Sequence, residues 1–356
     1  MRQILNNQQL KDRVKDFNEN LFRTGREDDF EMPYQRLRTL NKHVRFNTAD
    51  YGGIQIGRLF RYIKKIRKHY LRILNADDDE ITKLISEFNS IIPSDRINEK
   101  FWKDVVRAMR YNALRDQEFL KILRPLGIKT CVYCHSQLTL VVKKKIAKIR
   151  NEARQVNVGD VLQWKGLLEL DHRYPKSEFP FLCTSFFNLY PICGSCNKAK
   201  SDNPSGFTLY HTGPLLNVFR FVLADNAVVQ YLNDKDPEKI KITFSHVDPG
   251  VPENEKLASD YDKMFSISGI YGAQVDVVEE LIHKQQVYTK HYNKALLDDF
   301  ASLFPDQGMF TRLVIGTYEK EDDIFRRPLT KFIQDIARDI QLIDEHGNLC
   351  QMPEED

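Results

Sequence analysis

Two stretches of the 356-residue chain say most about its fold: CVYCHS at residues 131–136 and LELDHRYPKSEFPFLCTSFFNLYPICGSCNKAKSD at residues 168–202. Each contains a Cys-x-x-Cys pair, Cys131 with Cys134 and Cys193 with Cys196. A turn of this spacing places two thiolates side by side, and two such turns offer four sulfurs at about 2.3 Å to one tetrahedral ion. The spacing therefore predicts a structural zinc site that joins two distant segments.

The other cysteines, Cys183 and Cys350, have no partner at this spacing and are expected to be simple thiols. A disulfide framework is typical of small, cysteine-dense secreted chains, which this one is not. Two alternatives to the four-cysteine zinc site stay open. The four residues are ordinary buried cysteines, or His135, next to Cys134, replaces one of them as a ligand.

Composition and charge narrow the class of protein. Hydrophobic residues are 42% and charged residues 29%, which is typical of a globular chain. The first residues are charged throughout, and no apolar run approaches the roughly 18–20 residues of a membrane helix, so we expect a cytoplasmic protein with no membrane association. Residues 251–356 carry 11 Lys and Arg against 21 Asp and Glu, whereas the preceding residues carry 42 against 29. A basic body with an acidic tail suggests a nucleic-acid partner.

Breaks in pattern divide the chain into three parts, and together they predict an α+β fold. Residues 1–125 are predicted to form a helical domain. Its clearest helix begins at Arg58, because apolar residues recur at three- and four-residue steps and seven Lys or Arg residues occupy the other faces up to Arg72. This basic helix is either a solvated surface or a surface that follows a phosphate backbone.

Residues 126–210 form the second predicted part and residues 211–356 the third, a mixed and mainly helical acidic domain. Within the second part we expect short strands at 164–172 and 186–192 and a helix beginning near residue 197. The lysine-rich segment 143–155 is expected to be a basic helical insertion. In the third part the segment AVVQYL, residues 227–232, is expected to be a strand.

A group of polar residues lies between and directly after the cysteine pairs: Asp171, His172, Asn188, Asn197, Lys198 and Lys200. Their order, framed by two Cys-x-x-Cys pairs, resembles the zinc-stapled branch of the HNH nuclease family, which has a ββα-metal fold. The resemblance covers residues 131–202. The interval from Cys134 to Asp171 is longer than the family usually shows, and the insertion 143–155 accounts for the difference.

The resemblance implies a role for each residue. His172 would be the general base, because a neutral imidazole can take a proton from water near pH 7. Asp171 and Asn197 would give oxygen ligands to a catalytic Mg²⁺ or Mn²⁺, and Asn188 would tie down the loop that orients His172. Four simpler interpretations stay open: His172 is a surface histidine or a further ligand of the zinc region, Asp171 only orients the histidine, Asn197 is only a helix N-cap, and Lys200 is a solvated lysine.

The function implied by these residues is metal-dependent hydrolysis of phosphodiester bonds in nucleic acid, with DNA favoured. Proteins of this architecture resemble nuclease effectors of restriction or anti-phage systems that work beside an ATPase, so a protein partner or self-association through the C-terminal domain is expected. The residues predicted to contact nucleic acid are Lys143, Lys144, Lys145, Lys148, Lys198 and Lys200. The alternative is a zinc-stabilised nucleic-acid-binding module, or an interaction scaffold, without catalysis.

Overall fold

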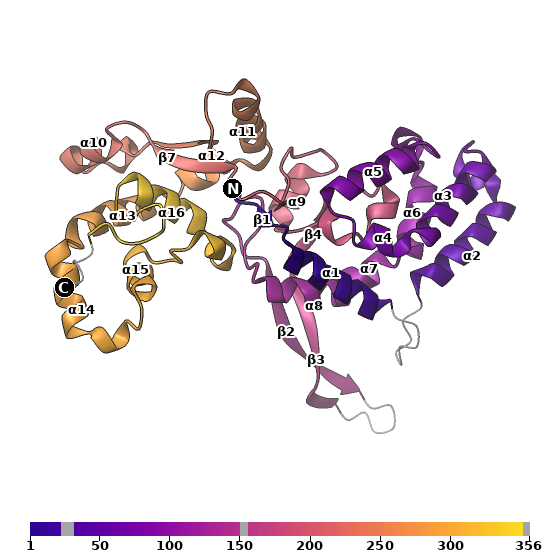
Figure 1. The fold of residues 1–356 in the computed structure, drawn as a ribbon, viewed down its shortest axis with the longest axis horizontal. Coiled ribbons are helices and arrows are strands. Elements are labelled where there is room, and N and C mark those ends of the chain that lie inside the picture. The colour runs from indigo at the N-terminus through magenta and orange to yellow at the C-terminus, as the bar shows by residue number, and fades with distance from the viewer. Residues whose placement is uncertain (23–31, 150–155, 352–356) are drawn as a thin grey trace.

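The computed structural model describes residues 1–22, 32–149 and 156–351 and shows two lobes joined through the cysteine-rich segment (Figure 1). Helices and small two-stranded sheets are both present, which confirms the expected α+β class. One hydrophobic core runs through all three predicted parts. Among the described residues, no helix combines the length and apolar character needed to span a bilayer.

The first lobe is helical, as predicted. Its helices are α1 (Gln8–Leu21), α2 (Pro33–Phe46), α3 (Ile56–Lys68), α4 (Tyr70–Leu74), α5 (Asp78–Asn89), α6 (Glu99–Ala108), α7 (Tyr111–Ala113) and α8 (Phe119–Leu123), with a π-helical turn at Leu114–Glu118. The apolar stripe of α3 is buried and its basic residues lie outside it, as the periodicity indicated. Residues 1–57, which gave little sequence signal, contribute α1 and α2.

The segment expected to be a basic helix is instead a β-hairpin. Strand β2 (Leu140–Ile149) pairs antiparallel with β3 (Val156–Leu167), and the hairpin projects from the body of the molecule in Figure 1. The prediction was wrong because lysine and alanine favour helix locally, whereas the β-branched residues on both sides find cross-strand partners. The rest of the expected helix, residues 150–155, lies outside the described residues.

A second antiparallel pair and a short helix follow the hairpin. Strand β4 (Glu169–His172) pairs with β5 (Leu189–Ile192), and α9 (Gly194–Lys200) comes directly after β5. The expected strands were too long, since the chain bends at Leu168 and forms a 3₁₀ turn at Phe186–Asn188. The loop between β4 and β5 packs its aromatic side chains into the helical lobe, where the rings of Phe181 and Phe88 stack at 3.9 Å.

The second lobe combines one antiparallel pair of strands with helices. Its elements are β6 (Tyr210–His211), β7 (Phe219–Leu223), α10 (Ala227–Asp234), β8 (Ile242–His246), α11 (Pro252–Phe265), α12 (Ile267–Gly272), α13 (Val275–Val287), α14 (Lys290–Asp299), α15 (Gln307–Ile315) and α16 (Thr330–Asp339). Strands β7 and β8 are antiparallel neighbours. The segment AVVQYL is helix α10 and not a strand, because a single apolar run does not distinguish the two.

The beginning of the chain belongs to this second lobe. Strand β1 (Ile4–Leu5) runs parallel to β6, and the amino group of Met1 donates to the carbonyl of Phe219 at 3.0 Å. Arg2 forms ion pairs with Glu321 and Asp322. The chain therefore starts between the lobes, enters the helical lobe at α1 and returns through the cysteine-rich segment (Figure 1).

Candidate functional site

The four predicted zinc ligands meet in one place. The sulfur atoms of Cys131, Cys134, Cys193 and Cys196 all lie within 4.8 Å of one another, and all four residues are buried. Four sulfurs bound to one tetrahedral zinc lie about 3.8 Å apart, as follows from a Zn–S bond of about 2.3 Å. The distance from the Cys134 to the Cys193 sulfur is 4.0 Å. The cluster could therefore hold a structural metal such as zinc.

Hydrogen bonds hold both turns of the cluster in place. Cys193 is the N-cap of α9, and its sulfur accepts the backbone N–H of Cys196 at 3.5 Å. The pKa of the Cys134 thiol is lowered, chiefly because the neighbouring thiol of Cys131 donates a hydrogen bond to its thiolate. The carbonyl of Cys134 accepts the hydroxyl of Tyr271 from the second lobe at 2.7 Å. The cluster thus connects α9 to the C-terminal helices.

His135 does not join the cysteine cluster. Across residues 1–22, 32–149 and 156–351, the group of metal-ligating side chains that includes Cys134 consists of the four cysteines. The imidazole of His135 packs against Phe325, and burial lowers its pKa to about 3. Of the two remaining cysteines, Cys183 is buried and Cys350 is exposed, and both are free thiols as expected.

Asp171 lies on the side of β4 that faces α9 and the first cysteine turn. Its Oδ1 accepts the ammonium of Lys200 at 3.2 Å, and its Oδ2 accepts the hydroxyl of Tyr133 at 2.8 Å. Lys200 also donates to the carbonyl of His172, and its side chain is 1% exposed. Burial raises the pKa of Asp171, although Lys200 and Tyr133 act in the opposite direction. Both carboxylate oxygens therefore already have protein partners.

His172 points to the other side of the strand, as expected for successive residues. Its Nε2 lies 3.1 Å from the carbonyl oxygen of Cys183, which can only accept, so Nε2 carries the proton and Nδ1 keeps a lone pair. Its ring packs against Tyr111 at 4.8 Å between centroids. Burial and the charge of Lys176 lower the pKa of His172 to about 3. The imidazole is consequently neutral at neutral pH.

Asn188 holds the loop on the His172 side. Its Oδ1 accepts the backbone N–H of Tyr174 at 2.8 Å, and its Nδ2 donates to the carbonyls of Tyr174 and Leu182 at 3.2 Å. Leu182 precedes Cys183, whose carbonyl receives His172. Asn188 and His172 therefore fix the same turn of the loop from two positions.

Asn197 lies inside α9, not at its N-cap, which is Cys193. The interpretation of Asn197 as a cap is therefore wrong. Its amide donates to Glu169, two residues before Asp171 on β4. Lys200 and Tyr133 hold the oxygens of Asp171, and Glu169 holds the amide nitrogen of Asn197, so the role of these two residues as ion ligands stays a prediction.

The lysines predicted to contact nucleic acid occupy different environments. Lys198 is exposed on α9, whereas Lys200 is buried against Asp171 and cannot reach a phosphate from that position. Lys143 is exposed on β2, and its ammonium lies 5.3 Å from the ring centre of Trp164. Lys144, Lys145 and Lys148 belong to the same strand, and their side chains lie outside what the structure describes.

Three contacts of the site were not anticipated: Tyr133 with Asp171, Glu169 with Asn197, and Tyr111 with His172. Two of them carry a sequence signal. Tyr133 lies within the first cysteine turn, and Glu169 is two residues from Asp171, on the same strand face. Tyr111 comes from a helix that is distant in sequence, so no local pattern predicts its contact with His172.

Comparison of the chain with protein-family models, with curated proteins and with solved structures gave no match. Its possible function is therefore argued from the residues and their geometry.

Proposed function

We propose that this chain is a nuclease of HNH type that hydrolyses phosphodiester bonds in nucleic acid, with DNA as the favoured substrate. The observation that carries the proposal is the geometry of His172. The residue ends the first strand of a strand–strand–helix unit, β4–β5–α9, whose two ends are joined by the cysteine cluster. Its Nε2 is held by a carbonyl, so its Nδ1 is the atom able to accept a proton.

In this proposal His172 takes a proton from the attacking water. A base must be neutral to do so, and with a pKa of about 3 the imidazole is neutral throughout the physiological range, although the same burial makes it a weak base. Asn188 fixes the turn that carries the Cys183 carbonyl and therefore the direction of the ring. Asp171, Tyr133 and Lys200 link the strand to α9 and to the first cysteine turn.

The resemblance implies a catalytic Mg²⁺ or Mn²⁺ at Asp171 and Asn197. In the structure the ammonium of Lys200 is bound to Oδ1 of Asp171, which is one of the oxygens that such an ion would use. The proposal is therefore tested with and without each ion. The proposal also includes a structural zinc in the cysteine cluster. It places the activity in the cytoplasm, beside a partner ATPase of an anti-phage or restriction system.

The test is plasmid nicking by the purified chain with Mg²⁺, with Mn²⁺ and without added divalent ion, in the wild type and in His172→Ala. Loss of a general base typically lowers the rate about 10²- to 10⁴-fold. We expect cleavage by the wild type and a loss of that size in the variant, with zinc content and DNA binding retained. His291→Ala, at an exposed position of α14 in the second lobe, is the control and should cleave normally. Full activity of His172→Ala would refute the mechanism.

The second candidate is a nucleic-acid-binding module without catalysis. The observation that favours it is the Lys200 ammonium on Asp171, which gives this carboxylate a structural partner. DNA binding without nicking under any of the three ion conditions would establish this alternative.

A further inference from the structure

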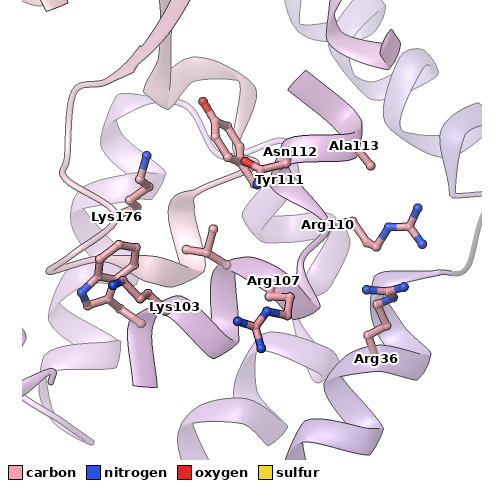
Figure 2. A pocket seen from close by; sticks show the side chains of 10 residues that line it. Arg36, Lys103, Arg107, Arg110, Tyr111, Asn112, Ala113 and Lys176 are labelled. Carbon is pink, nitrogen blue, oxygen red and sulfur yellow. The ribbon is translucent and has the colours of Figure 1, made fainter. Parts of the chain in front are cut away.

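A cavity of about 500 Å³ in the helical lobe has a strongly cationic lining. Its charged residues are all basic: Arg36, Lys103, Arg107, Arg110 and Lys176. Figure 2 shows the three arginines on one side of this cavity and Lys176 on the other. The cations come from α2, α6, the turn after α6 and the loop after β4, so the fold brings together charges that are far apart in sequence. We call this cavity the cationic pocket.

Two acidic residues contact cations of the pocket, and in both pairs at least one of the two side chains is largely exposed. Arg107 contacts Asp104 at 3.5 Å, but 74% of the Arg107 side chain is exposed, and such surface pairs are weak. Asp104 also accepts the hydroxyl of Tyr51 and the ammonium of Lys100. Lys103 pairs with Glu99, which is exposed. Gathered cations of this kind favour a bound polyanion.

A second cavity lies beside the pocket. Arg36 and Arg107 also line this cavity of about 470 Å³, to which Lys100, His43 and Asp104 contribute. Basic side chains therefore extend over more than the width of one phosphate. The lining also includes the indole of Trp102, which is partly buried. A basic path with an aromatic ring is the usual arrangement for binding an unpaired strand, whose bases stack on the ring.

The cationic pocket lies next to the candidate catalytic histidine. Tyr111 lines the pocket, and its ring packs directly on that of His172. Lys176 also lines the pocket, and its charge contributes to the lowered pKa of His172. A polyanion in the pocket would therefore lie one side chain away from His172.

We propose that the cationic pocket binds an unpaired strand of nucleic acid, with its phosphates at Lys103 and Arg107 and a base against Trp102. The proposal rests on the proposed nuclease function, because it identifies where the substrate strand lies beside His172. The helical lobe would then be the part of the protein that selects and holds a single strand.

The experiment measures binding and not cleavage, so it does not depend on catalysis. The chain has two tryptophans, and Trp164 lies on the hairpin between Arg124 and Lys143. Trp164→Phe leaves Trp102 as the only tryptophan, so its emission can be excited selectively. This variant is titrated with an oligothymidine DNA strand, with the corresponding RNA strand and with a DNA duplex of equal length, without added divalent ion. We expect a single strand to quench the Trp102 emission. Whichever single strand binds with the higher affinity, DNA or RNA, identifies the preferred sugar of the substrate.

The double variant Lys103→Gln/Arg107→Gln, at two exposed positions of α6, is compared with Lys239→Gln/Lys241→Gln, which removes the same charge from exposed positions in the second lobe. Hydrogen bonds to charged groups imply a loss of affinity of about tenfold or more in the first variant, and we expect no change in the second. Arg107→Gln alone, with a smaller expected loss, serves if the double variant does not fold.

Equal affinities of the pocket variants and the control would overturn the proposal, as would duplex binding that leaves the Trp102 emission unchanged. Quenching by a single strand together with no nicking would support the pocket and refute the nuclease. Nicking together with unaffected pocket variants would do the reverse.

Discussion

The cysteine cluster and the predicted catalytic residues come from the same stretch of chain, yet the fold arranges them differently. All four sulfurs lie within 4.8 Å of one another. The polar residues instead divide between the two sides of β4: Asp171 faces α9, which carries Asn197, and His172 and Asn188 hold the loop that carries Leu182 and Cys183. A Cys-x-x-Cys turn brings its two ligands together locally, whereas a strand sends neighbouring side chains apart.

The largest expected effect distinguishes the cysteine cluster from an ordinary buried thiol. Cys131→Ser should abolish zinc binding and destabilise the protein by at least about 5 kcal/mol, since structural zinc contributes about 10–16 kcal/mol in small zinc domains. Cys183→Ser, which is equally buried, should cost about 1–3 kcal/mol for its unpaired hydroxyl. Thermal unfolding and metal analysis, with about one zinc per wild-type chain, provide the measurement. Equal destabilisation by the two variants would argue against the cluster as a metal site.

The next effect examines the α9 side of β4. Lys200→Met leaves the buried Asp171 carboxylate without its cation, which should cost about 3–5 kcal/mol in the free energy of unfolding. Lys198→Met, on the exposed face of the same helix, should cost almost nothing. Adding Asp171→Asn to Lys200→Met should recover part of the loss, because no unpaired charge then remains. Denaturant unfolding of the wild type, Lys200→Met, Asp171→Asn and the double variant measures the coupling, with Lys198→Met as the control, and an absent coupling would show that this ion pair is not maintained in solution.

The smallest expected effect is the pH dependence of stability that His172, on the other side of β4, contributes. The pKa of His172 is about 3 in the folded chain and about 6.5 when unfolded, so the unfolded chain binds more protons between these values. Stability should consequently fall as the pH falls below 6.5, by about 2 kcal/mol from this residue between pH 7 and pH 5.

The comparison for this prediction is His172→Gln, which can keep a hydrogen bond to Cys183 but does not titrate. Unfolding curves of both proteins at pH 7 and pH 5 isolate the contribution of the histidine from that of the cysteine cluster. A wild type that loses no more stability than the variant would show that this imidazole is accessible to protons in the folded state.

Much of the architecture could be predicted from local pattern. The buried stripe of α3 and the convergence of the cysteine turns follow from periodicity and spacing. The structure of the lysine-rich segment could not be predicted this way, because pairing between β2 and β3 outweighs its helical propensity. Lys200 shows a similar limit. A lysine after a cysteine turn is usually solvated, and only the packing of α9 on β4 buries it against Asp171.

The sequence by itself determined the helical lobe, the cysteine cluster and the short list of polar residues between and after the two cysteine turns, since each is marked by a short local pattern: helical periodicity, the spacing within each cysteine pair, and the order of the polar residues around them. The tertiary structure alone decided which of those residues face one another and where the charges gather. Tyr111 reaches His172, and Arg36, Arg107 and Lys176 share a cavity, because helices distant in sequence pack against the loop after β4. Such long-range contacts are fixed by the burial of the whole core, so no local pattern contains them.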